Sequence, residues 1–319
     1  MRTAFIEQLC EMAESDHRVW LICGDIGFSV LEKFRDRFPR RFINCGVAEQ
    51  NMIGVAAGLA LCGKTVFVYS IANFPIMRCL EHIRNDVCYH NLNVKVVAVG
   101  GGLSYGSHGY THHSVEDIAV MCAMPNMIVA APGDPIEAQE ITRHFVEKMG
   151  PGYLRLGKAG EPVVHDRGKT VEFGRAVRLR EGGDLTLIST GGMLKSTVSA
   201  AQILFDRGLN TRVLSMPYII PLDVESILDA AQFTGGIITI EEHGPGGLGS
   251  AVGEVIARAG IGTAFRTLRL SRNPIKVAGS QETLRAAQGL GISDIVDSAI
   301  AVSQRSLPAP TSITNASTT

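Results

Sequence analysis

The segment RFINCGVAEQNMIGVAAGLALCGK, residues 41–64, joins a β-branched run to a helical run through a glycine turn. It predicts a strand over 41–45 and a helix over 47–61 whose small side chains leave a smooth face. Glu49 falls in the first turn of that helix, at the sheet edge where open α/β proteins bind ligands. We therefore expect a ligand site beside Glu49 and a subunit interface on the smooth face. The simpler alternative is that Glu49 only stabilises the helix N-terminus.

Outward from this segment, short β-branched runs alternate with helical segments, which is the pattern of stacked βαβ units. The first half predicts strands over 19–25, 41–45, 65–70, 94–100, 127–132 and 152–156, and helices over 28–38, 47–61, 75–89 and 134–148. The second half predicts a smaller α/β unit with helices over 194–207, 223–231 and 249–259. The fold class is therefore α/β, as two stacked domains with mostly parallel sheets.

The domain boundaries follow from breaks in these patterns. The first domain is expected over residues 1–158, and residues 159–170, with Gly, Pro and mixed charge, are expected to form a linker. The second domain is expected over 171–306. The Ser/Thr/Pro-rich tail, 307–319, is expected to be disordered.

Composition excludes several classes of protein. The 319 residues include 30 Lys and Arg against 31 Asp and Glu, without a basic block, so nucleic acid is not expected as a partner. Apolar runs stay well below the ~20 residues that cross a bilayer, and the first residues lack the layout of a signal peptide. Seven cysteines without a CxxC pattern indicate a reducing compartment. We expect a cytoplasmic protein with no membrane partner.

A glycine-rich stretch, GGGLSYGSHGYTHHSVED over 100–117, directly follows the apolar strand 94–100. It holds three histidines, and long loops at the end of a strand carry function more often than scaffold. Neutral imidazoles such as those of His108 and His112 suit proton transfer or hydrogen bonding to a hydroxylated substrate.

Two other interpretations of this stretch stay open. His108, His112 and His113 could bind zinc with Glu116 or Asp117, but the spacing matches no helix-borne metal motif, so we expect no metal site. Ser114 and Asp117 could instead form a capping box at a helix start.

The sequence GPGGLG, residues 244–249, satisfies the GxGxxG pattern and follows an apolar strand. It supports a rival function, an NAD(P)-dependent oxidoreductase. Against it, only one further strand follows, and no acidic residue stands where the ribose would be bound. The plainer alternative is a tight turn that presents Glu241, Glu242 and His243 to a domain or subunit contact.

Three segments together resemble the transketolase family of thiamine-diphosphate enzymes. GVAEQNMIGVAAGLALCGK, residues 46–64, resembles the signature of the pyrimidine-binding domain. Residues 107–138, from SHGYTHH to GDPIEA, resemble the stretch that begins at the family's substrate-binding histidine. ITIEEHGPGGLGSAVGE, residues 238–254, resembles the family's C-terminal domain.

The resemblance implies roles for four residues toward the cofactor and donor. Glu49 is implied as the catalytic carboxyl, hydrogen-bonded to N1′ of the aminopyrimidine. This bond would favour the imino tautomer of the ring, whose imine then deprotonates C2 of the thiazolium. Burial would help it share a proton with that nitrogen. Phe74 is implied to stack on the pyrimidine and Asp25 to lie near the thiazolium, although Asp25 could equally form a turn. His112 is implied to contact the donor's hydroxyl and carbonyl groups as a catalytic and substrate-binding residue.

The substrate end departs from the family pattern. The resemblance implies that transketolases have Asp at the position of His108 and His at the position of Gly100, and that both positions contact the sugar. Ordinary pentose-phosphate specificity is therefore not expected. Lys158 lies near the family's phosphate-binding arginine and could pair with an anion as a point charge. Arg78 is another candidate anion contact, or else part of a solvated helix face.

One expected motif is absent from the sequence. Family members bind the diphosphate and its divalent metal, Mg or Ca, through a domain with a GDG motif followed by Asn, whereas residues 24–27 here are Gly-Asp-Ile-Gly. The resemblance therefore implies the C-terminal subunit of a split, two-carbon ketol-transferring transketolase. It would act only with a partner that carries the GDG…N motif, in an α2β2 assembly.

Within the cofactor class, the alternatives are a subunit like 1-deoxyxylulose-5-phosphate synthase or a 2-oxoacid dehydrogenase β-type subunit. A further alternative is a non-catalytic regulatory subunit that kept the fold.

Overall fold

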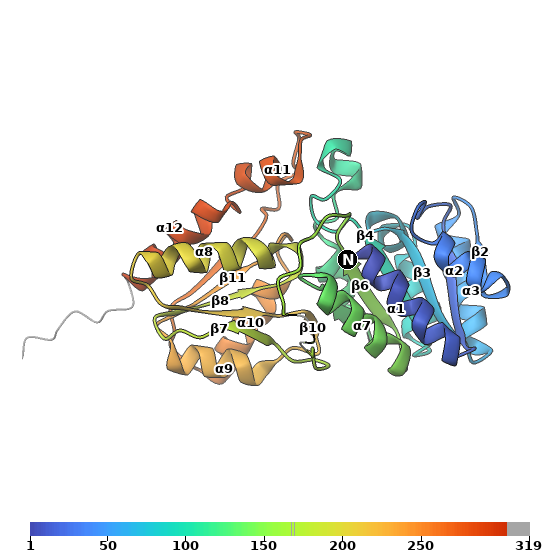
Figure 1. Ribbon diagram of the computed structural model, residues 1–319, viewed down its shortest axis with the longest axis horizontal. Coiled ribbons are helices and arrows are strands. Elements are labelled where there is room, and N and C mark those ends of the chain that lie inside the picture. Colours follow the sequence, from blue (N-terminus) through green and yellow to red (C-terminus); the bar gives the residue numbers. More distant parts are fainter. Residues whose placement is uncertain (167, 169, 305–319) are drawn as a thin grey trace, which may run out of the picture.

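The computed structural model describes residues 1–166, 168 and 170–304. Two α/β units lie side by side along the long axis (Figure 1). The expected disordered tail, 307–319, lies outside the described residues, as do positions 167 and 169 of the expected linker and positions 305–306.

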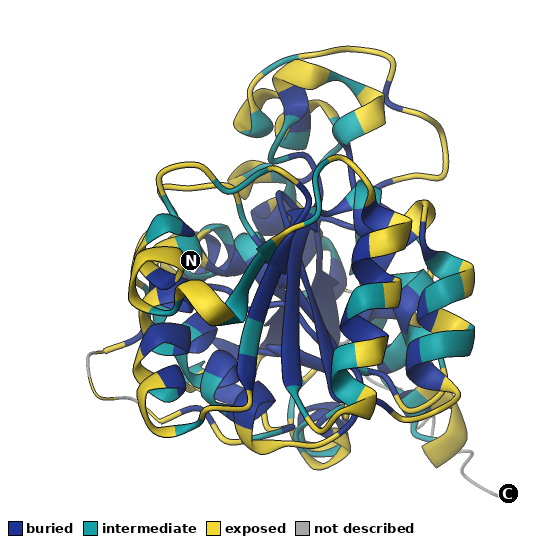
Figure 2. Cartoon of the chain, turned by 90° about the vertical axis from the view of Figure 1, so that its right-hand side faces the viewer, coloured by how far each residue is buried: buried dark blue, intermediate teal, exposed yellow. Residues whose placement is uncertain are grey.

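The described residues of the first unit build a seven-stranded sheet in the order β10-β5-β6-β4-β3-β1-β2. Its strands are β1 (Val19–Cys23), β2 (Phe42–Asn44), β3 (Thr65–Ile71), β4 (Val94–Val99), β5 (Ile128–Ala130), β6 (Gly152–Leu156) and β10 (Tyr218–Ile220). All neighbours pair in parallel except β10, which is antiparallel to β5. The central strands are buried on both faces between helices, which explains their continuous apolar runs (Figure 2).

Two hydrophobic cores cover the two faces of this sheet. The helices α1 (Arg2–Ser15) and α7 (Pro135–Glu147) contribute Phe5 and Phe145 to one core. The helices α3 (Glu49–Leu61) and α6 (Asp117–Cys122) contribute Met52 and Ile118 to the other. Parallel strands thus put the carboxyl ends of β1 to β4 and β6 along one edge, above these cores.

The described part of the second unit has a five-stranded sheet in the order β12-β11-β8-β9-β7. Its strands are β7 (Val177–Arg180), β8 (Leu185–Ser189), β9 (Thr211–Ser215), β11 (Ile237–Ile240) and β12 (Phe265–Leu268), with β7 antiparallel to β9 and the others parallel. The helices are α8 (Leu194–Asp206), α9 (Val224–Phe233), α10 (Leu248–Ala259), α11 (Gln281–Ala287) and α12 (Ile292–Ser303). In the described residues, α8 packs against α12 and α9 packs against α10. The mostly parallel α/β fold class is confirmed.

Several predicted elements differ in detail. The single helix predicted over 75–89 is divided into α4 (Asn73–Met77), α5 (Leu80–His82) and a π-helical turn (Ile83–Cys88), and α2 (Glu32–Arg37) is shorter than predicted. Short 3₁₀ turns cover Pro39–Arg41, Gly106–His108, Tyr110–His112 and Gly191–Met193. None of the helices within the described residues is long and apolar enough to cross a membrane.

Strand β10 was not predicted. It follows β9 of the second unit in the chain but pairs with β5 at the edge of the first sheet. The Tyr218 hydroxyl, buried, lies 2.7 Å from Nδ1 of His144 on α7, and Ala131 N donates to Pro217 O at 2.8 Å. Local periodicity does not reveal which sheet a three-residue strand joins, because distant residues decide that pairing.

Candidate active site

Glu49 is the first residue of α3 and stands where the chain turns away from β2. Its side chain is only 5% exposed, although an acidic side chain is seldom buried without a partner. It lines an open cavity of about 470 Å³ together with residues 47–51 and Arg78. The short β2–α3 turn therefore places a buried carboxyl at the carboxyl edge of the sheet, as predicted.

Arg78 provides the charge that balances Glu49. Its Nη1 lies 3.0 Å from Glu49 Oε2, and its guanidinium carbon lies 4.3 Å from the centre of the Phe74 ring. Gln50 Nε2 donates to the backbone oxygen of Arg78 at 3.0 Å. A planar cation thus stacks on Phe74 while it bonds Glu49, which are the two contacts that a planar, protonated heterocycle would need.

From Phe74 the site continues as a row of rings. The Phe74 and His112 rings are 5.4 Å apart between centroids, and those of His112 and His108 are 5.0 Å apart. Beyond His108 lies Tyr105 at 5.6 Å, and the Lys158 ammonium lies 5.0 Å from the centre of the Tyr105 ring. The structure therefore brings six predicted residues into one continuous row: Glu49, Arg78, Phe74, His112, His108 and Lys158.

Asp25 lies beside this row but makes different contacts. Its backbone has a φ of 58°, and its Oδ1 accepts a bond from Asn44 Nδ2 at 2.9 Å. The preceding residue, Gly24, approaches Glu49: a Cβ built on Gly24 would lie 3.8 Å from Glu49 Cγ. Asp25 is therefore held in a turn next to Glu49, on the exposed side, where both interpretations of this residue remain open.

The histidine loop is fixed at both ends. Gly102 and Ser114 pair as an isolated antiparallel bridge, and Asn73 Nδ2 donates to Thr111 O at 3.3 Å. Burial and the neighbouring histidines lower the pKa of His112, so its imidazole is neutral at pH 7. A neutral ring can both donate and accept a hydrogen bond, which suits contact with a hydroxylated substrate. Among the described residues, no group of three His, Cys, Asp or Glu side chains could hold a metal ion.

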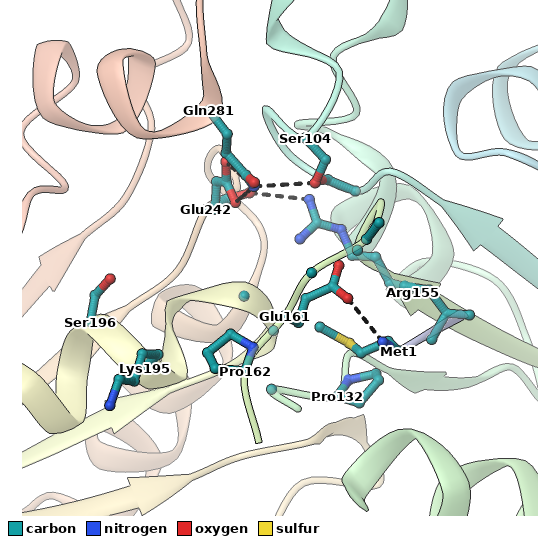
Figure 3. A pocket seen from close by; sticks show the side chains of 18 of the residues that line it. Met1, Ser104, Pro132, Arg155, Glu161, Pro162, Lys195, Ser196, Glu242 and Gln281 are labelled. Carbon is teal, nitrogen blue, oxygen red and sulfur yellow. Dashed lines mark hydrogen bonds and ion pairs between the residues drawn. The ribbon is translucent and has the colours of Figure 1, made fainter. Parts of the chain in front are cut away.

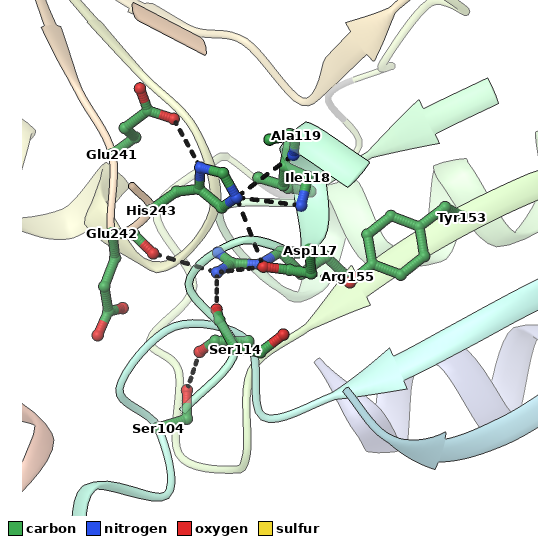
Figure 4. A network of polar contacts seen from close by, with 12 residues as sticks. Ser104, Ser114, Asp117, Ile118, Ala119, Tyr153, Arg155, Glu241, Glu242 and His243 are labelled. Atoms are coloured by element: carbon green, nitrogen blue, oxygen red, sulfur yellow. Dashed lines mark hydrogen bonds and ion pairs between the residues drawn. The ribbon is translucent and has the colours of Figure 1, made fainter. Parts of the chain in front are cut away.

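The structure corrects the capping-box prediction. Helix α6 begins at Asp117 with Glu116 as N-cap and without a side-chain capping bond. Asp117 is instead fully buried and accepts bonds from the Tyr153 hydroxyl and from Arg155, whose Nε lies 2.7 Å from Oδ2 (Figure 4). Burial alone would raise the pKa of Asp117, but the Arg155 guanidinium holds it below its usual range.

The same buried network joins the histidine loop to the second unit. Arg155 Nη2 donates to the backbone oxygens of Ser114 at 2.8 Å and Glu242 at 3.1 Å, and Ile118 N donates to His243 Nε2 at 3.1 Å (Figure 4). Sequence reasoning missed this network because its members come from three separate segments, 114–118, 153–155 and 242–243. It also shows that Glu242 and His243 form a domain contact, the plainer alternative for that turn.

The backbone N–H groups at the start of α10, where the GPGGLG turn ends, already have hydrogen-bond partners within the chain. Glu241, fully buried, accepts bonds from Leu248 N and Gly249 N, each at 2.8 Å, through its two carboxylate oxygens. These are first-turn N–H groups of α10, where a dinucleotide pyrophosphate would bind in an oxidoreductase. A carboxylate of the chain itself occupies them, which argues against the NAD(P) alternative.

Sequence reasoning also missed Tyr105, which lies between the histidines and Lys158. Gly100 has a φ of +82°, and a Cβ at that position would overlap Cδ2 and Cε2 of Tyr105. The available signal was indirect: the loop has Gly at position 100 and an aromatic residue five positions later.

Comparisons with known proteins bear on both units. The family model of the transketolase pyrimidine-binding domain matches residues 1–160, and that of the transketolase C-terminal domain matches residues 174–295. The chain is similar to an apulose-4-phosphate transketolase subunit of Phocaeicola vulgatus, with 40% identity over 80% of this chain and 83% of that protein. It is also similar to the 6-deoxy-6-sulfo-D-fructose transketolase subunit of Clostridium sp. (strain MSTE9), with 34% identity over 96% of this chain and 95% of that protein.

A solved structure extends the similarity to three dimensions. A split-gene transketolase, described as an inactive beta4 tetramer, has a TM-score of 0.84 and 35% identity, covering 96% of this chain and 97% of that one. The 1-deoxy-D-xylulose-5-phosphate synthase of Desulforudis audaxviator is 35% identical, but this chain covers only 47% of its length.

Proposed function

The chain belongs to the transketolase family, as a subunit of the split type, and from this premise we propose that Glu49, Phe74 and the histidine loop form half of a thiamine-diphosphate active site. The proposed reaction moves a two-carbon ketol unit from a ketose to an aldose. Membership of the family implies the cofactor, which supplies the nucleophilic carbon and the electron sink when bound. The protein residues bind, orient and move protons.

The observation that carries this proposal is the Arg78 guanidinium between Glu49 and Phe74. A planar cation that stacks at 4.3 Å and bonds the carboxylate at 3.0 Å occupies the position proposed for the aminopyrimidine. The residues present therefore suit that ring. On binding, the ring would displace Arg78, and Glu49 would then hold or release a proton at the ring nitrogen.

Substrate contacts are proposed along the rest of the row. His112 and His108 would bond hydroxyl and carbonyl oxygens of the sugar, and Lys158 would pair with an anionic group at its far end. Arg78, once displaced, is a second candidate for that anion. The substrates named for two relatives each carry a phosphate or sulfo group, which supports an anionic sugar as the substrate class.

We further propose a partner subunit that carries the GDG…N motif, the diphosphate site and a divalent metal, Mg or Ca. The cofactor would bind where the two subunits meet, in an α2β2 assembly. Two exposed apolar side chains support this contact: Val47, two residues before Glu49, is 77% exposed, and Phe28, in the segment after β1, is 75% exposed. The seven cysteines are free thiols, in keeping with a proposed cytoplasmic location.

The test is turnover of the pair reconstituted from this chain and its partner. Glu49→Ala should lower ketose cleavage at least about 100-fold, because it removes the proposed proton-transfer group, while assembly in size-exclusion chromatography is unchanged. Glu254→Ala, which removes an exposed carboxyl on α10, is the matched control and should keep full turnover.

Undiminished turnover of Glu49→Ala would sink the mechanism. Decarboxylation of pyruvate by the wild-type pair, without ketose cleavage, would instead favour the 1-deoxyxylulose-5-phosphate synthase or 2-oxoacid dehydrogenase alternative. A pair with neither activity would favour a regulatory subunit.

A further inference from the structure

Tyr105 occupies the centre of the substrate end of the row. Its half-buried ring meets the His108 ring edge-on at 5.6 Å and the His112 ring at 6.3 Å, and the Lys158 ammonium lies 5.0 Å from its centroid. A sugar bound between His112 and Lys158 would therefore lie beside Tyr105.

The position of this ring depends on Gly100. Because a Cβ at position 100 would overlap Tyr105 and lie 3.2 Å from its Cζ, the ring fills the space that any side chain at that position would need. The positive φ of Gly100 separately disfavours other residues there. Gly100 and Tyr105 thus act as one unit, in which a missing side chain makes room for an aromatic ring from the same loop.

The Tyr105 hydroxyl is available for a ligand. Within the described residues it makes no hydrogen bond, and it is not among the fully buried polar atoms, so part of its surface stays exposed. Burial of the side chain raises the pKa of the phenol, with a smaller opposing effect from Arg2, so the hydroxyl stays protonated and can donate at neutral pH.

The second unit holds the loop segment that carries Tyr105. Leu103 N donates to Glu242 Oε1 at 3.0 Å. Gln281 Nε2 donates both to the Ser104 hydroxyl at 3.1 Å and to Glu242 Oε2 at 2.9 Å (Figure 3). Ser104, Glu242 and Gln281 line a cavity of about 250 Å³ between the two units. Residues 103 and 104 are therefore fixed, and Tyr105 follows them directly.

We propose that Tyr105 is a substrate-recognition residue for an anionic ketose, a role that rests on the proposed transketolase function. Its hydroxyl donates a hydrogen bond to a sugar oxygen between His112 and Lys158. Its ring holds the Lys158 ammonium in place for the anionic group through a cation–π contact.

Steady-state kinetics of the reconstituted pair test this role, with 6-deoxy-6-sulfo-D-fructose, the substrate named for one relative, and its uncharged counterpart 6-deoxy-D-fructose as donors. Tyr105→Phe removes only the hydroxyl and should raise KM for both donors about two- to tenfold, with kcat changed less. Tyr105→Leu also removes the ring and should raise KM a further two- to fivefold or so, for the sulfonated donor alone. Tyr89→Phe, which removes the hydroxyl of an exposed tyrosine outside the histidine loop, is the matched control and should leave both KM values unchanged.

Wild-type KM values in both Tyr105 variants would overturn the proposal while leaving the proposed function intact. Absence of ketose cleavage by the wild-type pair would instead defeat the proposed function.

A double-mutant cycle on the isolated chain tests the Gly100–Tyr105 unit without turnover. Gly100→Ala should lower the Tm by several degrees in the wild-type background and by clearly less in the Tyr105→Ala background. Equal losses in both backgrounds would show that the ring does not occupy this space and would overturn the proposal.

Discussion

Removal of the charge on Asp117 should destabilise the chain far more than removal of the charge on an exposed carboxylate that lies at the same distance from an arginine. Asp117 is 0% exposed and lies 2.7 Å from Arg155 Nε, and Arg155 itself is 6% exposed. Asp117→Asn keeps the shape but leaves the buried guanidinium without its bonded carboxylate. Such a change costs about 3–5 kcal/mol in the free energy of unfolding.

The matched control is Glu225→Gln. Glu225 Oε2 also lies 2.7 Å from an arginine, Nη2 of Arg175, but the two side chains are 79% and 46% exposed. Solvent screens this pair, so its loss should cost less than about 1 kcal/mol. Burial, with bond length held equal, is then the only intended difference between the two variants.

The assay is urea unfolding of the isolated chain at pH 7, followed by far-UV circular dichroism and by the fluorescence of Trp20, the single tryptophan. Asp117→Asn should shift the midpoint to clearly lower urea, and Glu225→Gln should barely shift it. If the two variants lose the same free energy of unfolding, the reasoning about buried charge is refuted.

Three further predictions concern the site and its support. His108→Asp should shift substrate preference of the reconstituted pair towards ordinary sugar phosphates, and an unchanged substrate profile would show that position 108 does not select the sugar. Arg78→Ala should tighten thiamine-diphosphate binding by the pair up to about tenfold in titration calorimetry, because it removes the cation from the proposed ring position; weaker binding would contradict this. Burial alone would raise the pKa of Asp134, but bonds from His165 and backbone N–H groups lower it to about 2. This carboxylate therefore stabilises the fold above about pH 4 and loses that contribution as the pH falls towards 2. Asp134→Asn should accordingly be less stable than the wild type at pH 7 in urea unfolding, with a difference that shrinks in acid, whereas a difference independent of pH would disprove the assignment.

Much of the site could be predicted because its residues belong to contiguous segments. Glu49 was found from a strand, a turn and a helix that follow one another in the chain, and the histidine loop from glycines directly after an apolar strand. Parallel strands then bring such segments together, since their carboxyl ends meet at one edge of the sheet. Local pattern and sheet geometry were sufficient for Glu49 and the histidine loop, whereas Phe74 and Lys158 were expected only from the resemblance to the transketolase family.

The contacts across the fold could not be predicted in the same way. Strand β10 joins the sheet of the other unit, and Asp117, expected as a capping residue, is instead the buried partner of Arg155. Each depends on residues about 40 or more positions apart, whose encounter is decided by packing and by the cost of burying an unpaired charge.

The sequence by itself determined the α/β class, the ligand edge and the candidates Glu49, His108 and His112, because periodicity and turn chemistry are local; the other candidates came from the resemblance to a family. Only the tertiary structure decided that Arg78 stacks between Glu49 and Phe74, and that Tyr105 fills the space beside Gly100. Those positions depend on which side chains pack against each other, and this packing is decided only when distant segments come together in the folded chain.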